Sequence, residues 1–156
     1  MSKSLKRVRA ALEAAGQTPE IREVGQARTA QEAADSVGCE IDQIAKSIIF
    51  RSETDGRAVL FVTAGGNQVD PALATTVAGT KLARADAAFV RAQTGFAIGG
   101  VSPVAHLSPP LCYFDPRLQE FAVIYAAAGT PRHLFGIAPD VLRDLCGGQV
   151  ASFICT

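Results

Sequence analysis

Apolar and charged positions follow a helical period at the start of the chain. The apolar members stand three or four residues apart with charges between them, and they are Leu5, Val8, Leu12 and Ala15. This spacing predicts an amphipathic helix, which Gly16 can end. A second helix is predicted between Thr29 and Gly38, because Thr29-Ala30-Gln31-Glu32 has the spacing of an N-terminal capping box.

Two runs rich in β-branched and aromatic residues stand in the middle of the chain, at 44–52 and 58–63. Asp55-Gly56 lies between them and supplies the positive φ that a tight hairpin needs, so we expect a β-hairpin. Asp70-Pro71 and Asp86 are typical helix starts. They predict two short helices, one extending to about Val77 and the other to about Gln93.

Further short apolar runs predict strands at 19–24, 111–114, 121–126, 133–137 and 150–155, with a last helix over 139–145. Many of the connections between strands are too short to hold crossover helices, so a doubly wound parallel sheet fits poorly. We expect one α/β domain over residues 1–156, with a curved, mixed sheet surrounded by helices.

Composition narrows the class of protein. A chain of 156 residues with 48% hydrophobic and 19% charged residues is typical of one folded domain and excludes disorder. The 15 basic and 15 acidic side chains cancel, which disfavours a nucleic-acid binder held by a broad positive field, although a locally basic groove stays open. Charges interrupt the N-terminal segment and no long apolar run follows, so we expect a cytoplasmic protein without a secretory signal or membrane span.

The four cysteines form no C-x-x-C pair, and the two histidines lie far from any tight ligand cluster. This pattern disfavours a zinc site and is typical of free thiols in a reducing compartment. We also find no G-x-S-x-G elbow and no paired carboxylates. Any catalysis would therefore depend on positioning and electrostatics.

Lys46 is the most informative single residue. Side chains alternate along a strand, so Lys46 shares its face with Ile44, Ile48 and Phe50. An ammonium on an apolar face is costly unless it lines a cleft, meets an anion or loses its proton. The alternative is a lysine at the start of the strand whose amine reaches water along its stem.

The segment 94–103, Thr-Gly-Phe-Ala-Ile-Gly-Gly-Val-Ser-Pro, is the second candidate. Its glycines would let backbone amides approach an anion or a carbonyl closely. No Gly-Lys-Ser/Thr follows and no G-x-G-x-x-G precedes, so the loop is not a nucleotide-binding motif of either kind. The alternative is an ordinary glycine-rich connection.

The turn 126–133, Ala-Ala-Ala-Gly-Thr-Pro-Arg-His, is the third candidate. Its small side chains could form the floor of a pocket, with His133 as a donor at the edge. Histidine titrates in the range that suits acid–base catalysis, but a lone histidine is more often structural.

Together these segments resemble the YbaK/ProX family, free-standing relatives of the editing domain inserted in bacterial prolyl-tRNA synthetase. The resemblance is carried by the strand Ile-Ala-Lys-Ser-Ile-Ile-Phe around Lys46, the loop at 94–103, and Gln-Glu-Phe-Ala-Val-Ile-Tyr at 119–125, and it covers nearly the whole chain. It implies a mixed α/β fold with a barrel-like central sheet. It also implies hydrolysis of the ester that joins a wrong amino acid to the 3′ end of a tRNA, with no metal or other cofactor.

The resemblance also implies site residues. Lys46 corresponds to the pocket lysine of the family and is the candidate catalytic residue. The candidate substrate-binding residues, among them the loop expected to hold the terminal adenosine and the ester carbonyl, are Ser47, Gly99, Gly100, Ser102, Pro103, Gly129 and His133. Some relatives have a serine followed by two glycines where this chain reads Ala127-Ala128-Gly129. The amino acid removed therefore stays open among alanine, serine, cysteine and 2-aminobutyrate.

For the reaction we expect substrate-assisted attack by water. The Lys46 ammonium would anchor the ester or the terminal phosphate, and amides near Gly99 and Gly100 would stabilise the oxyanion. Because the net charge is zero, we expect the protein to hold only the acceptor end of the tRNA, with tRNA for proline as the expected substrate. A prolyl-tRNA synthetase or an elongation factor would hold the rest. Neither a membrane nor DNA is an expected partner.

Two rival functions stay open. A non-catalytic module could recognise a tRNA end or a synthetase without cleaving anything. A thiol enzyme could pair one of the cysteines with His106 or His133, but its thiol would need a lowered pKa that no sequence pattern reveals.

Overall fold

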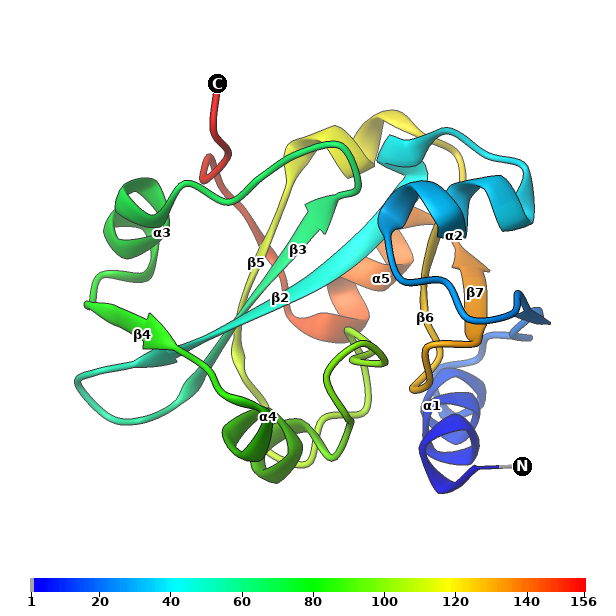
Figure 1. Cartoon of the computed structure of the whole chain (residues 1–156), viewed down its shortest axis with the longest axis horizontal. Helices are drawn as coiled ribbons and strands as arrows, with labels where there is room; N and C mark the ends of the chain where they lie inside the picture. The colour runs from blue at the N-terminus through cyan, green and yellow to red at the C-terminus, as the bar shows by residue number, and fades with distance from the viewer. Residues whose placement is uncertain (1) are drawn as a thin grey trace.

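The computed structural model describes residues 2–156. Figure 1 shows its helices and strands interleaved along the chain. The helices are α1 (Lys3–Ala14), α2 (Ala30–Val37), α3 (Pro71–Ala78), α4 (Ala87–Thr94) and α5 (Pro139–Cys146), and 3₁₀ turns cover Ile41–Gln43 and Pro116–Glu120. The strands are β1 (Ile21–Glu23), β2 (Ile44–Ser52), β3 (Ala58–Ala64), β4 (Leu82–Arg84), β5 (Leu111–Phe114), β6 (Ile124–Ala127), β7 (His133–Ile137) and β8 (Gln149–Val150).

All eight strands belong to one mixed sheet in the order β1-β7-β6-β2-β3-β5-β8, with β4 paired to β2 outside this path. The β2–β6, β3–β5 and β5–β8 pairs are parallel, and the others are antiparallel. The sheet is strongly twisted in Figure 1. The expected mixed sheet is thus confirmed, and a doubly wound parallel sheet is excluded.

Helices cover both faces of the sheet. Side chains of β3 alternate between the two faces, so each face contributes to a separate core. Leu60 faces the core that contains Leu12 of α1 and Leu142 of α5. Phe61 faces the opposite core, which contains Ala74 of α3. The short helix α2 packs over the start of β2 in a third cluster.

Local signals placed most helix ends correctly. The side chains of Thr29, Asp70 and Asp86 accept hydrogen bonds from the first-turn amides of α2, α3 and α4. Glycines in the left-handed region end all three helices. In the β2–β3 hairpin Gly56 has φ +71°, as the Asp-Gly pattern predicts.

Three strand predictions need correction. The strand expected over 121–126 begins only at Ile124, and residues 121–123 form an irregular link between it and the 3₁₀ turn at 116–120. The strand expected over 150–155 is short, since β8 ends at Val150. Beyond it, the Phe153 carbonyl accepts from Asp70 N and Cys155 N donates to Gln68 O, so the tail binds the segment before α3. The short strand β4 is not predicted at all.

Among residues 2–156 no helix combines the length and the apolar character that crossing a membrane requires.

Candidate functional site

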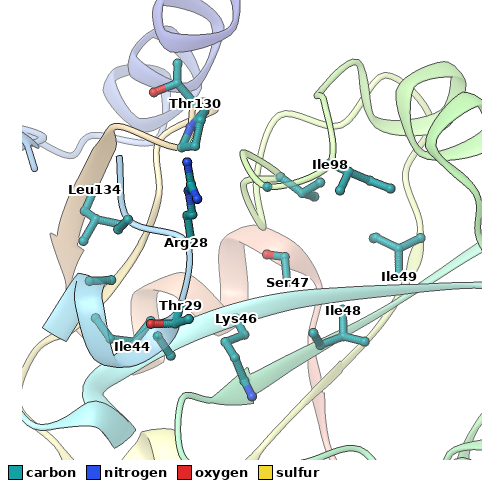
Figure 2. A pocket seen from close by; sticks show the side chains of 16 residues that line it. Arg28, Thr29, Ile44, Lys46, Ser47, Ile48, Ile49, Ile98, Thr130 and Leu134 are labelled. Atoms are coloured by element: carbon teal, nitrogen blue, oxygen red, sulfur yellow. The ribbon is translucent and has the colours of Figure 1, made fainter. Parts of the chain in front are cut away.

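A cavity of about 410 Å³ lies beside the middle of β2. Figure 2 shows it between that strand, the start of α2, the loop after α4 and the turn that joins β6 to β7. Most of its wall is small or aliphatic, and its lining residues are Ala27, Arg28, Thr29, Ala30, Ala33, Ile44, Lys46, Ser47, Ile48, Ile49, Ile98, Gly99, Val101, Thr130, Pro131 and Leu134.

The cavity follows an uncovered stretch of the edge of β2. On the side away from β3, β6 pairs with Ile44–Ala45 and β4 pairs with Phe50–Ser52. Neither strand reaches residues 46–49, and all four of these residues line the cavity. Side chains alternate along a strand, so four consecutive lining residues mean that the cavity runs along the edge and not over one face.

Lys46 lies on one side of this edge with its amine turned away from the glycine loop. Its Nζ donates to the Asn67 carbonyl at 2.6 Å, and in Figure 2 it points to the side of β2 opposite Ser47 and Ile98. Burial lowers the pKa of Lys46, and the negative charges of Asp115 and Asp42 oppose that shift. The lysine therefore lines the cavity with its aliphatic stem. Its half-buried amine is fixed by the hydrogen bond to the Asn67 carbonyl.

A buried carboxylate positions the carbonyl that holds Lys46. Asp115 is 1% exposed and accepts hydrogen bonds from Ala64 N at 3.0 Å and Asn67 Nδ2 at 2.9 Å. Asp115 and Asn67 were not predicted as site residues. The only sequence signal was Asp115-Pro116, a helix-start pattern, and nothing in it indicates that the carboxylate reaches across to the 65–68 turn.

Ser47 lies on the other side of the same edge. Its Oγ is buried and has no hydrogen-bond partner among the described residues. Figure 2 shows the hydroxyl on the side of Ile49 and Ile98. A buried hydroxyl without a partner is costly, so a ligand polar group placed against it would supply a missing hydrogen bond.

The two glycines of the loop have different surroundings. Gly99 lines the cavity with φ +94°, and a Cβ added to it would meet nothing within 4 Å. Gly100 is buried, and a Cβ there would stand 2.9 Å from Thr130 Cα. Its N–H donates to the Ala97 carbonyl at 3.0 Å, so the Gly100 amide is already occupied.

Ser102 and Pro103 lie deeper and do not line this cavity. Ser102 is fully buried, and its carbonyl accepts a hydrogen bond from His106 Nε2 at 2.6 Å. Pro103 borders a different cavity of about 420 Å³. These residues therefore shape the loop from behind.

Gly129 and His133 lie on the far side of the 128–131 turn. A Cβ on Gly129 would stand 2.8 Å from Ser4 O, so this glycine permits close packing on α1. His133 Nδ1 is 2.7 Å from Thr130 Oγ1, and its Nε2 is 4.0 Å from Glu23 Oε2. His133 lines a third cavity, of about 450 Å³, which shares Thr130 and Pro131 with the first.

Arg28 is a lining residue that the sequence did not reveal. It is exposed, makes no ion pair within residues 2–156, and extends toward Thr130 in Figure 2. A free guanidinium at the mouth of a cavity suits a phosphate group. Its only sequence signal was a single basic residue before a helix cap.

The thiols lie elsewhere. Cys146 and His106 border the same 420 Å³ cavity, but His106 Nε2 is engaged by Ser102 and the Cys146 Sγ lies 3.5 Å from Cys112 Sγ. Within residues 2–156, no histidine ring nitrogen is hydrogen-bonded to a cysteine thiol. Residues 2–156 also contain no group of three or more potential side-chain ligands that could hold a metal ion.

Comparison with known proteins identifies the family of the chain. Residues 24–145 match the family model described as aminoacyl-tRNA editing domain. The chain is 31% identical over 127 residues to YwhH, an uncharacterised protein of Bacillus subtilis, and the match covers 81% of this chain and 80% of the relative.

Two further relatives have more informative names. EbsC of Enterococcus faecalis, named a putative Cys-tRNA(Pro)/Cys-tRNA(Cys) deacylase, is 27% identical over 124 residues, covering 79% of this chain and 75% of the relative. A crystal structure described as a putative trans-editing enzyme for prolyl tRNA synthetase is 43% identical, with a TM-score of 0.93 and coverage of 100% of this chain and 99% of the other.

Proposed function

Because the chain belongs to the aminoacyl-tRNA editing domain family, we propose that it is a trans-editing deacylase that hydrolyses the ester of mischarged tRNA. The amino acid removed is small, in the range of alanine, serine, cysteine or 2-aminobutyrate, and the tRNA is tRNA for proline. The names of EbsC and of the similar crystal structure support this substrate class.

The observation that carries the proposal is the 410 Å³ cavity with Lys46, Ser47 and Gly99 on its wall. Its volume is in the range of small-ligand sites. A synthetase pocket discriminates poorly between side chains that differ by one methylene, so a second, small site is needed to remove the wrong product. A cavity of this volume with a mostly aliphatic wall suits a short side chain attached to a terminal adenosine.

The chemistry needs no protein nucleophile. Water adds to the ester carbonyl carbon, the bond from that carbon to the ribose oxygen breaks, and the ribose oxygen takes the proton. The neighbouring ribose hydroxyl assists this attack. The Lys46 ammonium, after leaving the Asn67 carbonyl, and the Arg28 guanidinium supply positive charge to the terminal phosphate, which positions the ester.

The test is deacylation of a panel of tRNAs for proline charged with alanine, cysteine, serine or 2-aminobutyrate. We expect rapid hydrolysis of at least one of these esters and no hydrolysis of prolyl-tRNA. Lys46→Ala should lower kcat/KM by roughly a hundredfold, the order of magnitude of losing one group that stabilises charge in the transition state. Lys81→Ala, which removes an exposed lysine elsewhere, is the matched control and should keep the wild-type rate.

Two results would change the assignment. Failure on every member of the panel, with retained binding of tRNA, would favour the non-catalytic binding module. Loss of deacylation on alkylation of the cysteines would favour the thiol enzyme instead.

A further inference from the structure

The main chain of Ser47 faces the cavity. In an antiparallel ladder the backbone groups of successive residues point alternately toward and away from the partner strand. Ser52 N donates to Arg57 O across the β2–β3 hairpin, and the register of that pair is continuous from Ala45 to Arg51. Even-numbered residues of β2 therefore bond to β3, and Ser47 presents its N–H and C=O on the opposite edge.

No strand covers that edge at Ser47. The β6 pairing stops at Ala45 and the β4 pairing starts at Phe50. Glu53 N donates to Lys81 O, which confirms that odd-numbered positions face the side of β4. The N–H and C=O of Ser47 thus face the cavity that this residue lines, and the unpartnered Ser47 Oγ is buried beside it.

A backbone N–H and C=O of one strand residue can exchange two hydrogen bonds with one residue of another strand. An aminoacyl ester carries the same two groups on one carbon, a free α-ammonium that donates and an ester carbonyl that accepts. The gap between β6 and β4 leaves space for one such residue, and the cavity supplies room for its side chain.

Resting on the proposed function, we propose that Ser47 binds the aminoacyl group as a one-residue strand: Ser47 N–H donates to the ester carbonyl and Ser47 C=O accepts from the α-ammonium. The ammonium has a further N–H for Ser47 Oγ. The ligand class is therefore an α-amino acid ester with a free amine. Because the Gly100 N–H already donates to the Ala97 carbonyl, the Ser47 N–H is the better candidate for the donor to the reacting carbonyl.

The first experiment varies the substrate of the wild-type protein. Alanyl-tRNA for proline, or whichever member of the panel is best hydrolysed, is compared with its α-hydroxyacyl counterpart, made by deamination with nitrous acid. Each rate is divided by the uncatalysed rate in the same buffer, because the two esters differ in intrinsic reactivity. We expect the hydroxy ester to be cleaved roughly tenfold more slowly or worse, since the Ser47 carbonyl loses the charged donor.

The outcomes of this experiment distinguish a failure of the role proposed for Ser47 from a failure of the proposed deacylase function. Equal corrected rates for the two esters would overturn the role of Ser47 while leaving the deacylase in place. Hydrolysis of neither ester would remove the proposed function, and the role of Ser47 with it.

The second experiment removes the N–H. Proline is tolerated in strands where the N–H faces an uncovered edge, so Ser47→Pro should fold, whereas Ile48→Pro should not because its N–H bonds to β3. Ser47→Ala lacks the hydroxyl but keeps the N–H, and is therefore the reference. We expect Ser47→Pro to be roughly tenfold slower than Ser47→Ala at equal circular dichroism.

Equal rates for Ser47→Pro and Ser47→Ala would overturn the proposal. If Ser47→Pro fails to fold, the comparison of the two esters in the wild-type protein decides alone.

Discussion

His106 is a residue whose protonation the fold opposes. Burial lowers its pKa, the nearby Arg7 charge lowers it further, and the hydrogen bond to the Ser102 carbonyl opposes these effects. The folded pKa thus lies below the unfolded value of about 6.5. As pH falls through that range the unfolded chain binds more protons, so His106 should reduce the stability of the fold toward pH 5.

The measurement is the melting temperature of wild type and His106→Gln between pH 8 and about pH 5. The glutamine keeps an N–H for Ser102 O but does not titrate. We expect a smaller drop in Tm for the variant. Parallel Tm curves would show that protonation of His106 is not opposed by folding.

For single residues, the sequence predicts which face of a strand a side chain occupies better than it predicts the hydrogen-bond partner of that side chain. Strand alternation correctly places Lys46 on one side of β2 and Ser47 on the other. It cannot supply the partner of Lys46, because the Asn67 carbonyl belongs to a turn that Asp115 holds from another part of the chain. Contacts of this kind depend on tertiary packing.

Among the elements, the turn after β6 packs closely on α1 at Gly129. Gly129 and Gly99 have nearly the same φ, +95° and +94°, but a Cβ would meet Ser4 O at 2.8 Å in the first and nothing within 4 Å in the second. Alanine at either position is strained by about 1–2 kcal/mol. Gly129→Ala should lose about 1–3 kcal/mol more, because α1 must shift.

Urea denaturation of the two variants measures this difference, with Gly99→Ala as the matched control for backbone strain. Equal losses in the free energy of unfolding would mean that α1 yields without cost.

Helices and the hairpin were predictable because their signals are local: an N-cap side chain, a glycine at the end, an Asp-Gly turn. The strands β4 and β8 have only three and two residues, and pairing with neighbours defines them more than composition does. For the same reason no local pattern could reveal the uncovered edge at Ser47, which exists because β6 and β4 both stop short of it.

For the whole molecule, a formal net charge of zero limits how it can hold a large polyanion. With few phosphates contacted, a plot of log affinity for tRNA against log salt should have a slope of about −1 to −3. Arg28→Ala should make that slope shallower by about one, if Arg28 contacts a single phosphate. A slope steeper than about −6 would instead indicate a broad tRNA-binding surface.

The overall class of fold followed from the sequence, since short connections excluded a doubly wound sheet and left a mixed one. The order of the strands did not, because β2 pairs with β6 and β3 with β5 across long stretches of chain. Only the folded molecule brings Arg28, Lys46 and Gly99 to the lining of one cavity.

Arg7 joins α1 to the end of α4 and the loop that follows it, which lie 87 or more positions further along the chain. Its guanidinium donates to Thr94 O at 2.8 Å and to Ala105 O at 3.0 Å, and lies 4.4 Å from the centre of the Phe96 ring. Opening α1 would therefore break the support of the glycine loop at the same time. In amide hydrogen exchange, α1 and the loop should open as a single cooperative unit with one shared free energy.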